Sequence, residues 1–221
     1  MFRALVAVVA LLAAATTSSA QVKEPIGRFV VDVRAASVGL PGAEGWTPTV
    51  PEGTQVPGRS LGVDAGAHVY LLRLRVVAVG VGATFLTGRG RTSPPAVDED
   101  PATPPAIIPE VTTRLSSIAP QVSLNFGHSL GWSYISVGLG RAKVESEALI
   151  PRGGLVTFTP RASGWTKALN YGGGARWFIN QHVGVGLDIR WHKLSPVPRS
   201  GTHPGAPRAS LVTAGAGIVF K

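Results

Sequence analysis

The strongest constraint on the fold of this chain is an alternation of apolar residues with polar or small ones, which recurs along most of its length. The clearest case is 183–191, where Val, Leu, Ile and Trp fill every second position with Gly, Asp and Arg between them. Successive side chains of a strand point to opposite faces, so each such segment has one apolar and one polar face. Seven more segments repeat the pattern: 28–35, 61–71, 77–85, 117–126, 134–140, 169–177 and 212–220.

Composition distinguishes a membrane barrel from a soluble sheet protein. Only 15% of the residues are charged, and the chain contains 28 glycines. After the N-terminus no run approaches the roughly 18 consecutive apolar residues of a transmembrane helix. In a transmembrane barrel lipid-facing and lumen-facing residues alternate, which disperses the apolar ones in this way. The sequence therefore predicts an all-β fold, an antiparallel up-and-down transmembrane β-barrel of about eight strands.

The links between these segments alternate between long and short. The long ones are 39–59, 88–112, 143–163 and 195–208, and every proline except Pro25 and Pro120 lies in one of them. Proline cannot donate to an interior ladder, and outer-membrane barrels combine short periplasmic turns with long extracellular loops. Pro120 stands within an expected strand, so we expect a bulge or a different strand boundary there.

The N-terminus indicates export. Arg3 precedes an apolar run at 4–15 and a small, polar stretch that ends at Ala20. This predicts a signal peptide over 1–20 and a mature barrel domain over 21–221, because the apolar run is shorter than the roughly 20 residues of an anchor helix. The chain has no cysteine, which excludes lipoprotein anchoring, disulfides and thiol catalysis. We expect the mature protein in the cell outer membrane.

The polar faces carry charges of both signs, which a barrel of this size would enclose in an interior just wide enough for side chains. Buried charges must be paired, so we expect ion pairs and hydrogen bonds that plug the lumen. A narrow polar pore or a proton-linked site is the alternative. The residues expected in this network are Arg28, Asp32, Arg34, Asp64, His68, Arg176, Asp188, Arg190 and His192.

A catalytic site is weakly indicated. His192, with Ser195 just beyond it and His203 in the following link, resembles the His and Ser pairs of barrel enzymes that act on lipid A or phospholipid. The spacing is not diagnostic and no orienting carboxylate can be assigned, so we expect no enzyme, with a lipid-modifying enzyme as the alternative. The histidines lack metal-ligand spacing, and we expect neither a metal nor a cofactor.

Aromatic residues stand near the ends of the expected strands. Rings of this kind settle at membrane interfaces, although plain packing explains them equally well. The residues concerned are Tyr70, Trp132, Tyr171, Trp177 and Trp191.

The final segment resembles the signal by which the outer-membrane assembly machinery recognises its substrates. Thr213 and Gly215 provide the polar and glycine positions, and Ile218 and Phe220 provide the hydrophobic ones. Lys221 after the terminal aromatic residue departs from that pattern. The assembly machinery is therefore an expected partner during biogenesis.

The chain also resembles the family of outer-membrane β-barrel domain proteins, the small OmpA-like barrels. The likeness lies in 125–127 with 131–134, in 170–191 and in the terminal segment, and it is one of pattern. It implies an eight-stranded barrel in the outer membrane and no particular activity. We expect no peptidoglycan-binding domain after the barrel, so the resemblance does not imply a role in tethering the cell wall.

The net charge of +9 indicates anionic partners. An exported chain rarely meets nucleic acid, so we expect outer-membrane lipids and lipopolysaccharide phosphates as partners. Arg152, Arg161, Arg199 and Arg208 in the links could contact such phosphates, although loop charge that simply faces solvent is the more common explanation. We expect a monomer with a role in envelope structure or surface interaction through four long extracellular loops. A soluble periplasmic barrel around an apolar ligand is a further alternative, but the charged face is too rich in small residues to face solvent.

Overall fold

The computed structural model describes residues 24–42, 45–48, 50, 54–74, 76–92, 109–152, 155–162, 164–199 and 205–221. The expected signal peptide and His203 lie outside these residues. No helix within the described part of the chain is long and apolar enough to cross a membrane.

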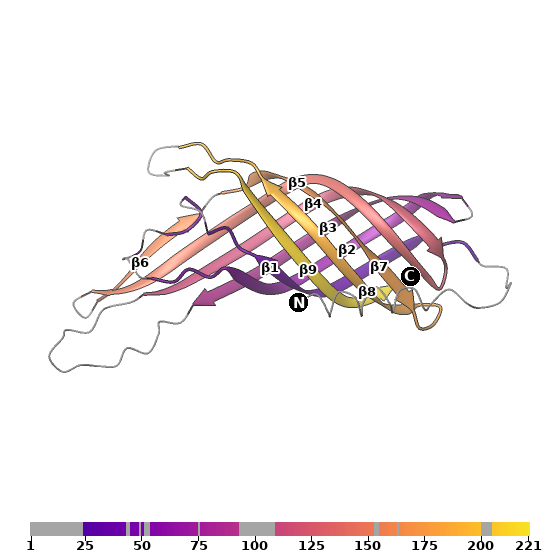
Figure 1. Ribbon diagram of the computed structural model, residues 1–221, viewed down its shortest axis with the longest axis horizontal. Helices are drawn as coiled ribbons and strands as arrows, with labels where there is room; N and C mark the ends of the chain where they lie inside the picture. Colours follow the sequence, from indigo (N-terminus) through magenta and orange to yellow (C-terminus); the bar gives the residue numbers. More distant parts are fainter. Residues whose placement is uncertain are drawn as a thin grey trace, which may run out of the picture.

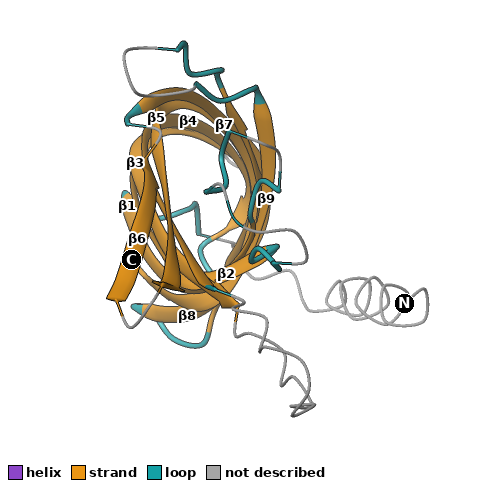
Figure 2. Cartoon of the chain, turned by 90° about the vertical axis from the view of Figure 1, so that its left-hand side faces the viewer, coloured by secondary structure: helices purple, strands orange, loops and turns teal. Residues whose placement is uncertain are grey.

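Nine antiparallel strands form in the described residues, and eight of them close into a barrel (Figures 1 and 2). Around the barrel the order is β1, β2, β3, β4, β5, β7, β8 and β9, and β9 pairs with β1 to complete the ring. The strands are β1 (Phe29–Gly39), β2 (Arg59–Leu74), β3 (Val77–Thr92), β4 (Glu110–His128), β5 (Gly131–Arg152), β6 (Leu155–Ala162), β7 (Thr166–Phe178), β8 (Val183–Leu194) and β9 (Ala209–Phe220). The predicted eight-stranded up-and-down barrel is confirmed, and each alternating segment lies in one barrel strand, except that Arg28 precedes β1.

The prediction of a long link over 143–163 was wrong. β5 continues to Arg152, and β6 returns beside it as an extra strand, which among the described strands pairs with β5 alone. The adjoining strands are long as well, and β4 pairs with β5 from His128 to Glu110. Above the apolar belt the outward side chains are charged, as in the ion pairs Arg91–Glu110 (2.8 Å) and Arg114–Glu147 (3.5 Å). Strand pairing therefore extends past the region in which outward residues are apolar.

The bulge expected at Pro120 is not there. β4 runs through Pro120, and its register with β5 is the same before and after it, at Ile118↔Arg141 and Gln121↔Gly138. Pro120 keeps its partner Ala83 in β3 but has none in β5, because its missing N–H falls on the β5 side. The register shift of the barrel lies instead in β2, between Tyr70 and Leu72.

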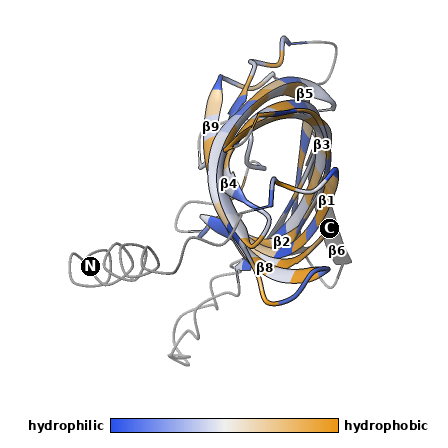
Figure 3. Cartoon of the chain, turned by 90° about the vertical axis from the view of Figure 1, so that its right-hand side faces the viewer, coloured by the Kyte–Doolittle hydropathy of each residue, from blue (hydrophilic) through white to orange (hydrophobic). Residues whose placement is uncertain are grey.

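The outer face of the barrel is apolar around its whole circumference. In Figure 3 hydrophobic and hydrophilic residues alternate along the strands of the ring. Large apolar side chains on the outside are 39–78% exposed, far more apolar surface than a soluble monomer presents. Examples on different strands are Phe29, Leu61, Phe85, Val122, Ile135, Leu187 and Ile218. A closed barrel with an apolar outer belt and short turns at one end is the architecture of an outer-membrane β-barrel.

Candidate functional site

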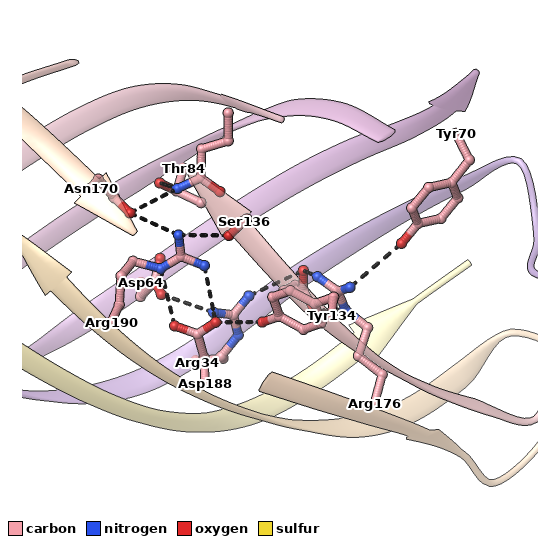
Figure 4. A network of polar contacts seen from close by, with 12 residues as sticks. Arg34, Asp64, Tyr70, Thr84, Tyr134, Ser136, Asn170, Arg176, Asp188 and Arg190 are labelled. Atoms are coloured by element: carbon pink, nitrogen blue, oxygen red, sulfur yellow. Dashed lines mark hydrogen bonds and ion pairs between the residues drawn. The ribbon is translucent and has the colours of Figure 1, made fainter. Parts of the chain in front are cut away.

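The middle of the lumen is filled by ion pairs between side chains that project inward from different strands (Figure 4). Arg34 of β1 lies at their centre. Its Nη1 donates a hydrogen bond to Asp64 Oδ2 at 2.9 Å, and its Nη2 lies 3.1 Å from Asp32 Oδ2. Asp188 Oδ2 lies 3.7 Å from the same guanidinium, so Arg34 connects carboxylates of β1, β2 and β8.

Arg176 of β7 reaches across the barrel to Asp32. Its Nε and Nη2 donate to Asp32 Oδ1 and Oδ2 at 2.9 and 2.7 Å, the paired geometry in which guanidinium binds carboxylate best. The guanidinium also lies 3.9 Å from the centre of the Tyr134 ring, in a cation–π contact. Arg176 is 1% exposed, so its neutralisation depends on these contacts.

The third pair joins Arg190 to Asp188 on β8. The Arg190 Nε and Nη2 donate to the two carboxylate oxygens at 3.1 and 3.0 Å. The remaining nitrogen, Nη1, donates to Ser136 Oγ and Asn170 Oδ1 at 3.0 and 2.8 Å. The Tyr134 hydroxyl donates to Asp188 Oδ2 and thereby links this pair to the Arg176 contact.

The charges of this lumen network balance. Within the described residues it contains three arginines and three aspartates, all at most 3% exposed. His68 and His192 are also buried inside the barrel. Arg28 was wrongly predicted to belong to the network, because it precedes β1 at a bend and its side chain is exposed. The remaining eight predicted residues lie inside: Asp32, Arg34, Asp64, His68, Arg176, Asp188, Arg190 and His192.

The structure does not join His192 to Ser195. Both ring nitrogens of His192 lack a hydrogen-bond partner among the described residues, and the ring faces the lumen. Ser195 lies beyond the end of β8, where its carbonyl accepts from Thr166 Oγ1. The described residues also contain no cluster of three or more metal-ligating side chains.

Apolar side chains close the lumen at the short-turn end. Trp132 stacks on Phe178 at 4.8 Å between ring centres and meets Tyr70 edge to face. Tyr70 and Trp132 are 4% and 3% exposed, so their predicted place at the membrane interface was wrong: both point inward. Trp191 and Tyr171 do lie on the outer side, where their rings stack at 5.8 Å.

A larger apolar layer closes the lumen at the long-link end. Trp46, from the link between β1 and β2, is 2% exposed and packs with inward residues of the barrel wall. The wall residues come from seven of the barrel strands and are Ala36, Val38, Leu86, Leu115, Ala142, Val144, Ala168, Leu194, Ala209 and Leu211. The lumen thus has a charged middle between two apolar ends.

A band of basic residues borders the outer apolar belt at the long-link end, and sequence reasoning missed it. Each residue is exposed and occupies an outward position of its strand one or two steps beyond the apolar ones: Arg59, Arg89, Arg114, Arg141, Lys167 and Lys193. The signal was available, because each stands in phase with the apolar residues of its segment. It was overlooked because the expected strands were ended where apolar residues stopped.

Three members of this band form a row of cations across β5, β7 and β8, which we call the basic row. Arg141 stands directly opposite Lys167. Lys193 pairs with Leu169, the next outward residue of β7, and is therefore diagonal to Lys167. No ion pair joins these three to a carboxylate of the described residues, although like charges directly opposite destabilise a sheet.

The other predicted residues lie as follows. Arg199 and Arg208 are exposed in the link between β8 and β9, and the side chains of Arg152 and Arg161 lie outside the described part. In β9 Thr213 points into the lumen, whereas Ile218 and Phe220 face outward. Gly215 is half-buried beside β1. Recognition of these β9 residues by the assembly machinery stays a prediction.

The barrel is similar in fold to solved outer-membrane proteins. Neisserial surface protein A matches over 87% of this chain and 96% of its own, with 13% identity and a TM-score of 0.48. Ail, the attachment invasion locus protein of Yersinia pestis, matches over 89% and 98%, with 13% identity and a TM-score of 0.44. The outer membrane protease OmpT from Escherichia coli matches over 93% and 99%, with 9% identity and a TM-score of 0.46.

No protein-family model matches the chain, and no curated protein matches its sequence. The solved structures share only 9–13% of residues with it, so the likeness is one of fold and assigns no activity.

Proposed function

We propose that this protein is a non-enzymatic, non-conducting barrel of the outer membrane that binds lipopolysaccharide phosphates through the basic row. In this role it contributes to envelope structure and holds its long links at the cell surface. The main observation behind the proposal is that Arg141 and Lys167 stand directly opposite each other and that neither forms an ion pair with a carboxylate of the described residues.

The position of the basic row supports phosphate as its ligand. Arg141 and Lys167 are the next outward residues after Leu139 and Leu169, the last apolar residues on the outer face of their strands. They therefore stand at the level of lipid head groups. Two or three cations on neighbouring strands lie within reach of one phosphate. A bound phosphate would replace their mutual repulsion with attraction.

The lumen network supports a closed barrel. A path for ions would have to pass Arg34, Arg176 and Arg190, each held by aspartates at 2.7–3.1 Å. Apolar layers lie on both sides of this charged section. An eight-stranded barrel has no spare width once such side chains fill it. We therefore expect no ionic conductance when the purified protein is inserted into planar bilayers.

The test is thermal unfolding of the refolded protein in micelles, followed by its migration on gels before and after heating. Added lipopolysaccharide should raise the unfolding temperature, since a ligand that binds only the folded state stabilises it. Arg141→Ala combined with Lys167→Ala should remove at least half of this rise. Lipopolysaccharide stripped of its phosphates should give little rise with either protein.

The matched control is Arg28→Ala with Arg73→Ala, which removes two exposed arginines at the opposite end of the barrel. This variant should respond to lipopolysaccharide as the unaltered protein does. An equal rise in the row variant and the unaltered protein would refute phosphate binding there. Recovery of the protein from buffer without detergent would refute membrane insertion altogether.

A further inference from the structure

The long-link end of the lumen has the composition of a binding chamber. Interiors of transmembrane barrels are usually polar, yet at this end inward valine, leucine and alanine side chains form a buried cluster, with hydroxyls such as those of Ser117 and Ser146 beside it. The charged network below it forms a closed floor. Small-molecule sites combine predominantly apolar walls with a few polar groups that fix orientation. The wall residues satisfy the first part of that description.

Buried polar groups without hydrogen-bond partners match the second part of that description, the few polar groups that fix a ligand's orientation. Ser60 Oγ, Thr213 Oγ1 and both ring nitrogens of His192 have no hydrogen-bond partner among the described residues, and all three residues are at most 2% exposed. Buried polar atoms are normally hydrogen-bonded, so several unpaired ones in one place require an explanation.

These three residues lie together beside the apolar wall. Ser60 and Thr213 both stand opposite Val38, and His192 stands opposite Leu211. Their strands, β8, β9, β1 and β2, are consecutive in the barrel. The unpaired hydroxyls and imidazole therefore form an arc along one side of the lumen, at the boundary between the apolar wall and the charged floor.

Trp46 occupies the chamber and belongs to a link rather than to the wall. Its Nε1 donates to the Pro207 carbonyl at 2.8 Å, and its own carbonyl accepts from Ser146 Oγ at 3.2 Å. Gly45 before it has φ +99° and lies so close to Gly205 that a Cβ would be 2.9 Å from the Gly205 carbonyl oxygen. The indole is thus held by one hydrogen bond, the backbone of Trp46 by a second, and the link by its tight contact with the β8–β9 link.

We infer that the apolar chamber binds a small planar apolar molecule with one hydrogen-bonding group, and that Trp46 is the lid that this molecule displaces. The ring of the ligand takes the place of the indole among Val38, Leu115 and Leu211. Its polar group meets Ser60, Thr213 and His192. The charged floor stops the ligand from passing through, so the chamber is a dead end and the barrel stays closed to ions.

The test uses 2-naphthol and naphthalene, which share a ring system and differ by one hydroxyl. The protein is labelled with 5-fluorotryptophan in micelles free of lipopolysaccharide, and its five tryptophans are followed by fluorine NMR. The Trp46 signal is identified by its loss in Trp46→Phe. Because the basic row is unoccupied in this preparation, the outcome is independent of the proposed phosphate binding.

We expect 2-naphthol to shift the Trp46 signal saturably, while Trp165, which is 50% exposed, follows only the partition of the probe into micelles. Trp46→Ala should bind 2-naphthol at least about tenfold more tightly, because the lid no longer competes. The matched variant Trp165→Ala should bind as the unaltered protein does.

The polar arc is tested by Ser60→Ala combined with Thr213→Val. This variant should lose the preference for 2-naphthol over naphthalene by roughly threefold to tenfold, the usual worth of one or two neutral hydrogen bonds. A Trp46 signal that never shifts saturably in the unaltered protein would overturn the chamber. Equal binding of the two probes to the unaltered protein would overturn the role of the polar arc.

Discussion

The lumen network and the basic row lie on opposite faces of the same barrel wall, and they are built in opposite ways. Inside, each arginine has an aspartate within ion-pair distance, as in Arg176–Asp32 at 2.7 Å and Arg190–Asp188 at 3.0 Å. Outside, Arg141 faces Lys167 across the ladder, and no ion pair with a described carboxylate neutralises either. One cluster is neutral by itself and the other has an excess of positive charge.

The difference follows from whether the surroundings of each face can supply counter-ions. The lumen is closed at both ends by apolar layers, so a charge there must find its counter-charge within the chain. The outer rim meets lipid head groups and solution, which supply anions. The lumen network is therefore a structural element, whereas the basic row is, in our proposal, a surface on which an external anion completes the electrostatics.

The largest effect should come from removing a cation of the lumen network. Arg176→Ala leaves Asp32 buried without its paired donor, and breaking a buried ion pair in this way costs about 3–5 kcal/mol. Arg34, 3.1 Å from the same carboxylate, compensates only in part. The measurement is the free energy of unfolding in urea, with the barrel inserted in lipid vesicles and followed by tryptophan fluorescence.

The reason for that loss can be separated from a simple packing defect. Arg176→Met together with Asp32→Leu removes both charges and fills similar space, and it should recover more than half of the lost stability. If the double variant is as unstable as Arg176→Ala or less stable, then charge pairing is not what holds this part of the lumen.

A smaller loss of stability is expected at the Tyr134–Asp188 hydrogen bond, which connects the Arg176 and Arg190 parts of the lumen network. Tyr134→Phe removes the hydroxyl that donates to Asp188, and a hydrogen bond to a buried carboxylate is worth about 1.5–3 kcal/mol. Tyr171→Phe is the matched control on the outer face, where we expect a change of less than about 0.5 kcal/mol. Similar losses in the two variants would show that the lumen hydroxyl has no special role.

The alternation of the sequence was enough to find the eight barrel strands and the charged lumen. Residues such as Asp188 and Arg190 stand in phase with Gly184 and Gly186, on the face opposite the large apolar residues, and only the lumen face accommodates both. Which arginine meets which aspartate was not predictable, because Arg176 and Asp32 come from strands far apart in sequence and meet only across the closed ring.

Two features were not predicted, because the alternation used to identify strands occurs only where the outward side chains contact lipid. β6 and the outer part of β5 lie beyond the belt, where charged outward residues such as Lys143 and Glu145 replace apolar ones. Trp46 lies in a link that carries no periodic signal, and its burial depends on contacts with β5 and the β8–β9 link. Both features can be recognised only in the structure of the closed barrel.

The smallest effect should have the opposite sign to that in the lumen. Lys167→Glu replaces a like-charged pair across the ladder with an attractive one, because Arg141 stands directly opposite. In micelles free of lipopolysaccharide this should raise the free energy of unfolding by about 0.5–1 kcal/mol, the scale of a cross-strand charge pair. The gain should fall as salt is added, since both side chains are exposed to solvent.

Arg73→Glu provides the control for the added negative charge, because Arg73 is exposed at the opposite end and faces Ala78 across the ladder. It should leave the stability nearly unchanged. If Lys167→Glu destabilises the barrel under the same conditions, the rim cations do not repel one another, and the reason for assigning them an external anion disappears. If Lys167→Glu stabilises the barrel while Arg176→Ala destabilises it, then losing a cation has opposite effects on the rim and in the lumen. This is the difference expected between a surface that binds an external counter-ion and a core that contains its own counter-ions.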